Sequence, residues 1–131
     1  MMFVSWRISG KGFSPRQFVQ RFKLSADAIF MPEESQIGGR VIKTPSCNIT
    51  IPIRGDSNNS LISGIHRFIT LHKSAFRYLK YHDISSVIDI GVIVGEKKYY
   101  TRSVVLSKKS LSMLAELCVD LAVSSYQPSE K

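Results

Sequence analysis

The sequence is poor in long apolar runs and in cysteine. No apolar run approaches the roughly 20 residues needed to cross a bilayer, and the start, Met1–Arg7, lacks the basic and then apolar segments of a secretory leader. We therefore expect a cytoplasmic protein with no membrane partner. The two cysteines, Cys47 and Cys118, lie far apart in the sequence, which favours two buried free thiols over a metal or redox pair.

Signatures of catalysis and of nucleotide binding are also missing. The sequence has no Gly-rich phosphate loop ending in Lys-Ser or Lys-Thr, no His-Glu-x-x-His and no nucleophile elbow. Ser9–Gly12 is too short for either nucleotide-binding pattern and indicates a turn. His72 falls within an apolar helical stripe, where a partly buried core residue is expected rather than a base. We expect neither an enzyme nor a bound cofactor or metal ion.

Positive charge is the feature that stands out in an otherwise ordinary composition. Apolar residues make up 44% of the chain and charged residues 21%, a balance typical of globular domains. Lys and Arg number 18 against 10 Asp and Glu, which gives a net charge of +8. Such an excess favours an acidic partner, whether nucleic acid, an anionic membrane surface or an acidic protein.

Hydrophobic periodicity predicts a single α+β domain over 1–126, followed by a polar tail at 127–131. Alternation and β-forming residues predict strands at 3–9, 47–53, 86–94, 98–106 and 119–123, the third and fourth joined as a hairpin. Helical spacing and N-cap residues predict helices at 15–22, from 56–60 to 81, and from 107 to about 117, with a long loop at 25–45. We expect helices on one face of a mainly antiparallel sheet, with ferredoxin-like β-α-β repeats.

Basic residues gather at two places in this outline, which makes them candidates for partner binding. One group shares a flank of the long helix when plotted at about 100° per residue: His66, Lys73, Arg77 and Lys80. The other lies on the predicted hairpin: Lys97, Lys98 and Arg102. A charged flank is commonly just a solvated face, and the alternative is a binding surface. Tyr78 and Tyr81 on the same helix suit either base stacking or a protein interface.

Short motifs spread over most of the chain resemble a bacterial family named domain of unknown function 4279. They are the strand ending Arg7–Gly10, the helix start Phe13–Pro15 and the closing stretch from Leu106 through Leu114–Leu117 to Val119–Leu121. The sequence departs from the family at Phe22–Leu24, where Leu-Gly-Leu is more usual. The resemblance implies a bacterial protein, and some members look like immunity proteins that accompany polymorphic or contact-dependent toxins.

Two functions therefore follow as expectations. The first is an immunity protein that occludes the active site of a cognate toxin, plausibly a nuclease, whose acidic face complements the basic chain. The alternative is a basic nucleic-acid-binding module, whose affinity should fall steeply with salt.

Overall fold

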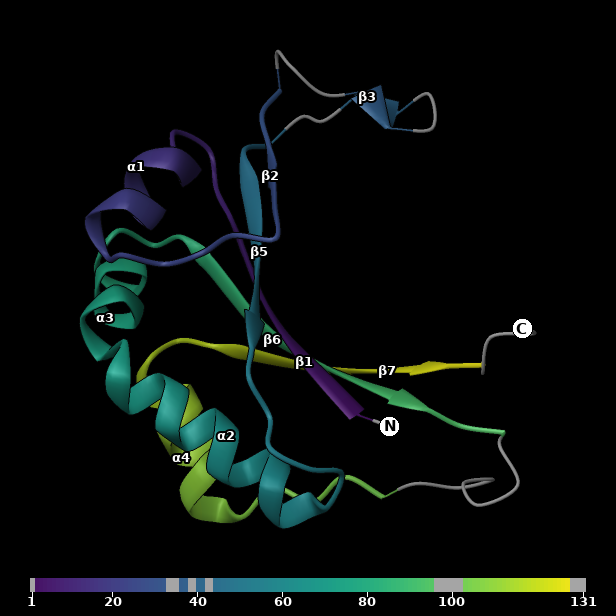
Figure 1. Ribbon diagram of the computed structural model, residues 1–131. Coiled ribbons are helices and arrows are strands. Elements are labelled where there is room, and N and C mark those ends of the chain that lie inside the picture. The colour runs from purple at the N-terminus through teal and green to yellow at the C-terminus, as the bar shows by residue number, and fades with distance from the viewer. Residues whose placement is uncertain (1, 33–35, 38–39, 42–43, 96–102, 128–131) are drawn as a thin grey trace.

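The computed structural model describes residues 2–32, 36–37, 40–41, 44–95 and 103–127. Within these ranges the chain forms, in order, β1 (Met2–Ser9), α1 (Pro15–Arg21), β2 (Ala28–Phe30), β3 (Gln36–Ile37), β4 (Arg40–Val41), β5 (Ser46–Ile51), α2 (Asn58–Leu71), α3 (Lys73–Tyr81), β6 (Ser85–Ile93), α4 (Lys108–Glu116) and β7 (Asp120–Tyr126). The predicted α+β class is confirmed (Figure 1).

The main sheet has five strands in the order β2-β5-β1-β6-β7. β1 lies at its centre and pairs antiparallel with β5 and β6, whereas β6 and β7 run parallel. The connection between β6 and β7 contains α4, and this is the one β-α-β unit with parallel neighbouring strands among the described residues. The sheet is thus mainly antiparallel, as predicted. Of the predicted β-α-β repeats, the described residues form one, β6-α4-β7.

Two predicted segments differ from the structure. The expected loop at 25–45 supplies β2, which pairs with β5, and it also supplies β3 and β4, which pair with each other. The expected strand at 98–106 lies largely outside the described residues, and its described part, 103–106, is not a strand. The position beside β6 that a hairpin would fill is taken by β7. Local alternation predicts a strand but carries no information about which neighbour it pairs with.

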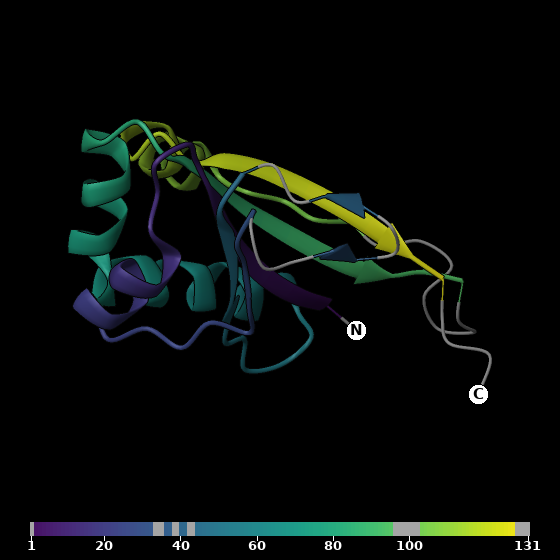
Figure 2. The same ribbon diagram turned by 90° about the horizontal axis from the view of Figure 1, so that it is seen from above.

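One face of the sheet is covered by helices. Figures 1 and 2 show α1, α2, α3 and α4 together on the same side of the strands. Burial along β1 alternates strictly, with Met2, Val4, Trp6 and Ile8 facing the helices, and β5 and β6 contribute buried residues in the same way. These side chains and the apolar helix faces form one core.

Trp6 lies at the centre of that core and is fully buried. Its ring stacks on Phe76 of α3, with centroids 4.0 Å apart, and meets Phe68 of α2 and Phe18 of α1 edge-on. Its indole Nε1 donates a hydrogen bond of 2.8 Å to Ser86 Oγ on β6, so the polar atom is satisfied inside the core. One side chain therefore joins β1 to three helices and a neighbouring strand.

The helix starts follow the predicted caps, but the long helix is broken. The side chains of Ser14, Ser57 and Ser107 each accept a backbone N–H at the start of a helix. At His72 the expected continuous helix divides into α2 and α3, with φ −112° and ψ 28° at the break. The break contains neither Pro nor Gly, and Phe68, His72 and Phe76 keep helical spacing across it. Periodicity therefore gives no sign of it.

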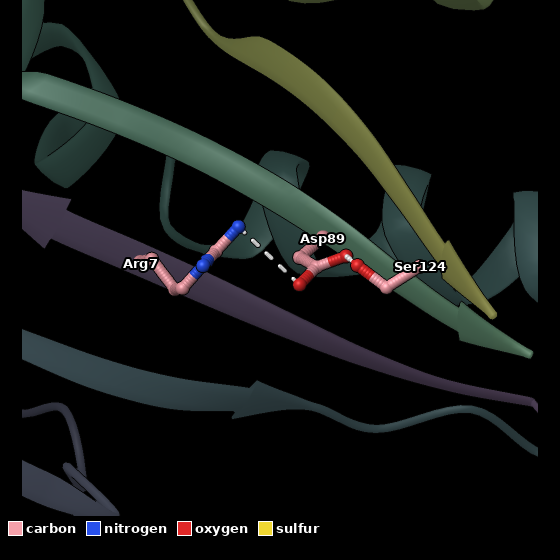
Figure 3. A network of polar contacts seen from close by, with 3 residues as sticks. All are labelled: Arg7, Asp89 and Ser124. Carbon is pink, nitrogen blue, oxygen red and sulfur yellow. Dashed lines mark hydrogen bonds and ion pairs between the residues drawn. The ribbon is translucent and has the colours of Figure 1, made fainter. Parts of the chain in front are cut away.

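The other face of the sheet carries no helix among the described residues, and polar contacts cross its strands. Arg7 on β1 forms an ion pair of 3.3 Å with Asp89 on β6, and Asp89 accepts a hydrogen bond of 2.9 Å from Ser124 on β7 (Figure 3). Further along this face, the ring of Phe3 lies over Gly91, where a Cβ would collide with it, and packs against Tyr126. Three strands are thus tied together on this face.

The cysteines occupy different environments. Cys47 is buried on β5, and burial raises the pKa of its thiol to about 11, which keeps it protonated and unreactive. Cys118 is exposed, which corrects the expectation that both thiols are buried. It follows α4 with a φ of +54°, in the turn that leads into β7.

The packing of Trp6 predicts a large loss of stability on truncation. Trp6→Ala should lower the free energy of unfolding by about 3–5 kcal/mol, because it removes contacts to three helices and leaves a cavity. The control is Phe3→Ala on the opposite face of the same strand, where 41% of the side chain is exposed and a loss of about 1 kcal/mol is expected. Denaturant unfolding measures both, and equal losses would contradict the central role of Trp6.

Stability should also depend on pH through His72. Desolvation lowers the pKa of His72 below its usual value of 6.5. As pH falls below that value, the unfolded chain binds a proton before the folded chain does, so the free energy of unfolding decreases until the folded pKa is passed. His72→Gln should reduce this decrease, measured by denaturant unfolding between about pH 7.5 and about pH 5. An unchanged pH profile would show that His72 does not contribute.

Candidate binding surface around helix α3

Helix α3 separates its apolar and basic residues onto two faces. Ala75, Phe76 and Leu79 are buried against the sheet. Lys73, Arg77 and Lys80 follow one another at intervals of four and three residues along the exposed side, and all three are exposed. The structure therefore confirms that these three predicted residues share one flank of the helix.

The flank forms one wall of a groove between α3 and α4. The groove has a volume of about 290 Å³ and is lined by Ile69, Thr70, Lys73, Arg77, Lys80, Met113, Glu116 and Leu117. Its apolar residues, Ile69, Met113 and Leu117, belong to the core or pack against it. Three cations thus face one carboxylate around a hollow with an apolar floor, which suits an acidic group carried on an apolar stem.

Lys80 has a structural role as well as a place in the groove. Its Nζ donates a hydrogen bond of 2.6 Å to the backbone carbonyl of Glu116, the last residue of α4. A cation at the carboxyl end of a helix satisfies a free carbonyl and complements the helix dipole. Lys80 therefore fixes the end of α4 relative to α3, while Lys73 and Arg77 have no such contact.

A second hollow lies on the other side of α3, beside α1. It has a volume of about 430 Å³ and is lined by Arg21, Phe22, Ser74, Arg77, Tyr78, Tyr81 and His82. Arg77 lines this α1–α3 hollow and the α3–α4 groove alike, so the two adjoin. A smaller hollow of about 280 Å³ continues past Arg21, Tyr78 and His82 as far as Lys11.

The α1–α3 hollow combines cations with aromatic rings. The guanidinium of Arg21 lies 5.3 Å from the ring centre of Phe22 and 5.0 Å from that of Tyr78. Tyr78 contacts His82, which in turn contacts Tyr81, and 85% of Tyr81 is exposed. No sequence signal points to Arg21, because its place beside α3 depends on how α1 packs, whereas His82 directly follows α3 as its C-cap.

The next feature of this surface is the absence of carboxylate partners for its cations within the described residues. In the ranges that the structure describes, no carboxylate lies within ion-pair distance of Arg21, Lys73 or Arg77. By contrast, Arg7 on the sheet face is paired with Asp89. We call the region formed by Arg21, Lys73, Arg77, Lys80, Tyr78 and Tyr81 the α3 surface.

His66 is not among the lining residues of the α3–α4 groove and forms a contact between α2 and α4. Its Nε2 is 2.9 Å from Ser110 Oγ on α4, and Ser110 also contacts Ser107, the N-cap of that helix. Ser110 is only 2% exposed, so this pair is not open to a substrate as a nucleophile and base would have to be. The contact gives His66 a structural role, and its predicted partner contact stays a prediction.

The second predicted group, Lys97, Lys98 and Arg102, lies outside the described residues. Two further lysines, Lys108 and Lys109, begin α4, at the end of that helix opposite to Glu116. Of the seven residues predicted for partner binding, the structure therefore brings Lys73, Arg77 and Lys80 together.

Comparisons with known proteins add no relative. No family model, curated protein or solved structure matches the chain. In the described part of the chain, no helix has the length and hydrophobicity to span a membrane. The same residues contain no group of three or more His, Cys, Asp or Glu side chains that could hold a metal ion. The α3 surface is therefore the feature on which a functional proposal has to rest.

The structural role of His66 leads to a stability prediction. His66→Ala should lower the free energy of unfolding by about 1–2 kcal/mol, because it removes the hydrogen bond to buried Ser110. Ser110→Ala should cost a similar amount, and the double variant should cost less than the sum of the two, with a coupling of about 1 kcal/mol. Arg67→Ala, exposed on the same helix, is the control. Additive losses in denaturant unfolding would argue against the contact.

Proposed function

We propose that this protein is a binding module that lays its α3 surface against an acidic face of a partner protein, and that it serves as an immunity protein against a toxin. The observation that carries the binding role is a set of cations, Arg21, Lys73 and Arg77, that have no carboxylate partner among the described residues and lie beside two hollows on either side of α3. Cations without internal partners are free to form ion pairs with an incoming surface, which accelerates encounter and selects acidic partners. The toxin as partner rests on the family resemblance.

The shape of the α3 surface would allow it to occlude the active site of a toxin. An acidic side chain of the partner enters the α3–α4 groove, where Lys73 and Arg77 meet its charge and the apolar floor accepts its stem. Around the adjoining hollow, Tyr81 and Arg21 provide the residue types that dominate binding energy at protein interfaces. The surface is built on rigid helices, so little ordering is needed on binding.

A specific observation also favours single-stranded nucleic acid as a second candidate. Tyr78, Tyr81 and the stacked guanidinium of Arg21 lie next to Arg77, and aromatic side chains beside cations are the usual means of holding unpaired bases and phosphates. On this alternative the bases stack on Tyr81 and the phosphates pair with Arg21 and Arg77.

Charge reversal on the α3 surface tests the primary proposal. The probe is the product of the neighbouring gene, co-expressed and co-purified with this chain. Lys73→Glu combined with Arg77→Glu should weaken the complex by about 100-fold, because it turns attraction into repulsion at the groove. The matched control reverses the same number of charges at Lys108 and Lys109, which are exposed and outside the surface. Calorimetry on the purified complexes measures both, and equal effects would place the interface elsewhere.

The salt dependence of binding separates the two candidates. A labelled single-stranded oligonucleotide of about 12 nucleotides is titrated by fluorescence anisotropy at low and high salt. Binding that falls steeply with salt and loses about 1–3 kcal/mol in Tyr81→Ala would support nucleic acid. A protein complex that survives high salt, with no oligonucleotide binding, would support the first proposal.

A further inference from the structure

The outer edge of β7 is open in the described structure. β7 is the last strand of the sheet and its neighbour on one side is β6. In the residues that the structure describes, no strand pairs with its other side. Figure 2 shows β7, in yellow, running along the margin of the sheet. A free strand edge presents backbone donors and acceptors in a row, ready to pair with another strand.

The hydrogen bonding of β7 identifies which residues face outward. The N–H of Val94 donates a bond of 3.0 Å to the carbonyl of Tyr126, so the backbone of Tyr126 faces β6. In a strand the N–H and C=O of one residue point to the same edge, and successive residues alternate. The backbone groups of Leu121, Val123 and Ser125 therefore point away from the sheet.

The edge lacks the devices that usually block strand pairing. Free edges are commonly protected by Lys, Pro or a bulge. The sequence of β7, Asp120–Tyr126, contains none of Lys, Arg, Pro and Gly, and its single charge is at its first residue. In the middle of the strand, 54% of Val123 is exposed.

We propose that this edge pairs with β7 of a second copy of the chain, antiparallel and about a twofold axis at Val123. The three outward-facing residues are centred on Val123, so a twofold axis can pass through this residue. Val123 of one copy then lies opposite Val123 of the partner subunit in a hydrogen-bonded pair. Leu121 of each copy lies opposite Ser125 of the other copy. Together with the pair at Val123, these pairs form about six hydrogen bonds between the strands. The two sheets become one continuous sheet.

The side chains of this register are compatible with each other. The two Val123 side chains meet on the helix-covered face and lose exposure. On the opposite face Ala122 lies beside Ser124 of the partner subunit, and Tyr126 beside Asp120 of the partner subunit, where a phenol can donate to a carboxylate. No like charges oppose each other. A slip of one residue would place inward-facing backbone groups at the contact, and a slip of two residues would leave two outward-facing pairs within β7 in place of three, so the register centred on Val123 forms the most hydrogen bonds.

The cations of the α3 surface do not oppose this pairing at close range. They lie around α3, and Figure 1 shows α3 at the opposite side of the molecule from the carboxyl end of β7. At physiological salt, charges separated by more than about 8 Å are largely screened. The α3 surface also stays free in the dimer.

Sedimentation equilibrium of the purified full chain tests the proposal. The wild type should be a dimer that dissociates on dilution between about 1 mM and about 1 µM. Val123→Lys should be monomeric over the same range, because it places two cations on the twofold axis. Leu71→Lys is the control, since Leu71 is 74% exposed at the end of α2 and outside the contact. A monomeric wild type, or a Val123→Lys variant that dimerises as well as the wild type, would overturn the proposal.

Disulfide trapping tests the register. In a Cys118→Ser background, Val123→Cys should form a crosslinked dimer on mild oxidation, because its Cα lies about 5.5 Å from its symmetry mate. Ser125→Cys is equally placed on the edge, but its symmetry mate is about 13 Å away in this register. Crosslinking of Val123→Cys alone supports the register, and equal crosslinking of the two variants overturns it.

Discussion

The stacking of Trp6 against Phe76 is the contact on which the other layers depend. β1 is central in the sheet, and its Trp6 side chain contacts α1, α2 and α3 in the helical layer. Because Phe76 is held in this way, the buried side of α3 is fixed, and its exposed side has to present Lys73, Arg77 and Lys80. The orientation of the basic surface is therefore a consequence of aromatic packing in the core, as the burial of one helix face determines what the other displays.

The cations on the two faces of the molecule have different surroundings. On the open face of the sheet, the cation Arg7 is neutralised by Asp89, which also accepts a bond from Ser124, so charge there joins strands. On the helical side, Arg21 and Arg77 line the α1–α3 hollow, and no carboxylate is among its described lining residues. Exposed ion pairs contribute little to stability, and the unpaired cations contribute even less.

Local sequence signals predicted well which segments form helices or strands, but they predicted poorly which segments pack or pair with one another. The three serine caps and the alternation of β1 act within a few residues, so Ser14, Ser57 and Ser107 were recognisable from the sequence. The parallel position of β7 beside β6, and the break at His72, depend on packing between distant segments. The same limit applies to the α3 surface. The sequence predicted the shared flank of Lys73, Arg77 and Lys80 because they lie on one helix, whereas Arg21 comes from a different helix and its place beside them was not predicted.

The central place of β1 has a consequence for synthesis of the chain. β1 precedes both of its neighbours, and its pairing with β6 joins residues as far apart as Met2 and Val92. A ribosome therefore releases the central strand of the sheet long before either partner strand exists. Until β6 emerges, Val4, Trp6 and Ile8 have no core to enter, and long-range pairing of this kind folds slowly. The nascent chain should thus depend on chaperones that shield apolar segments near its beginning.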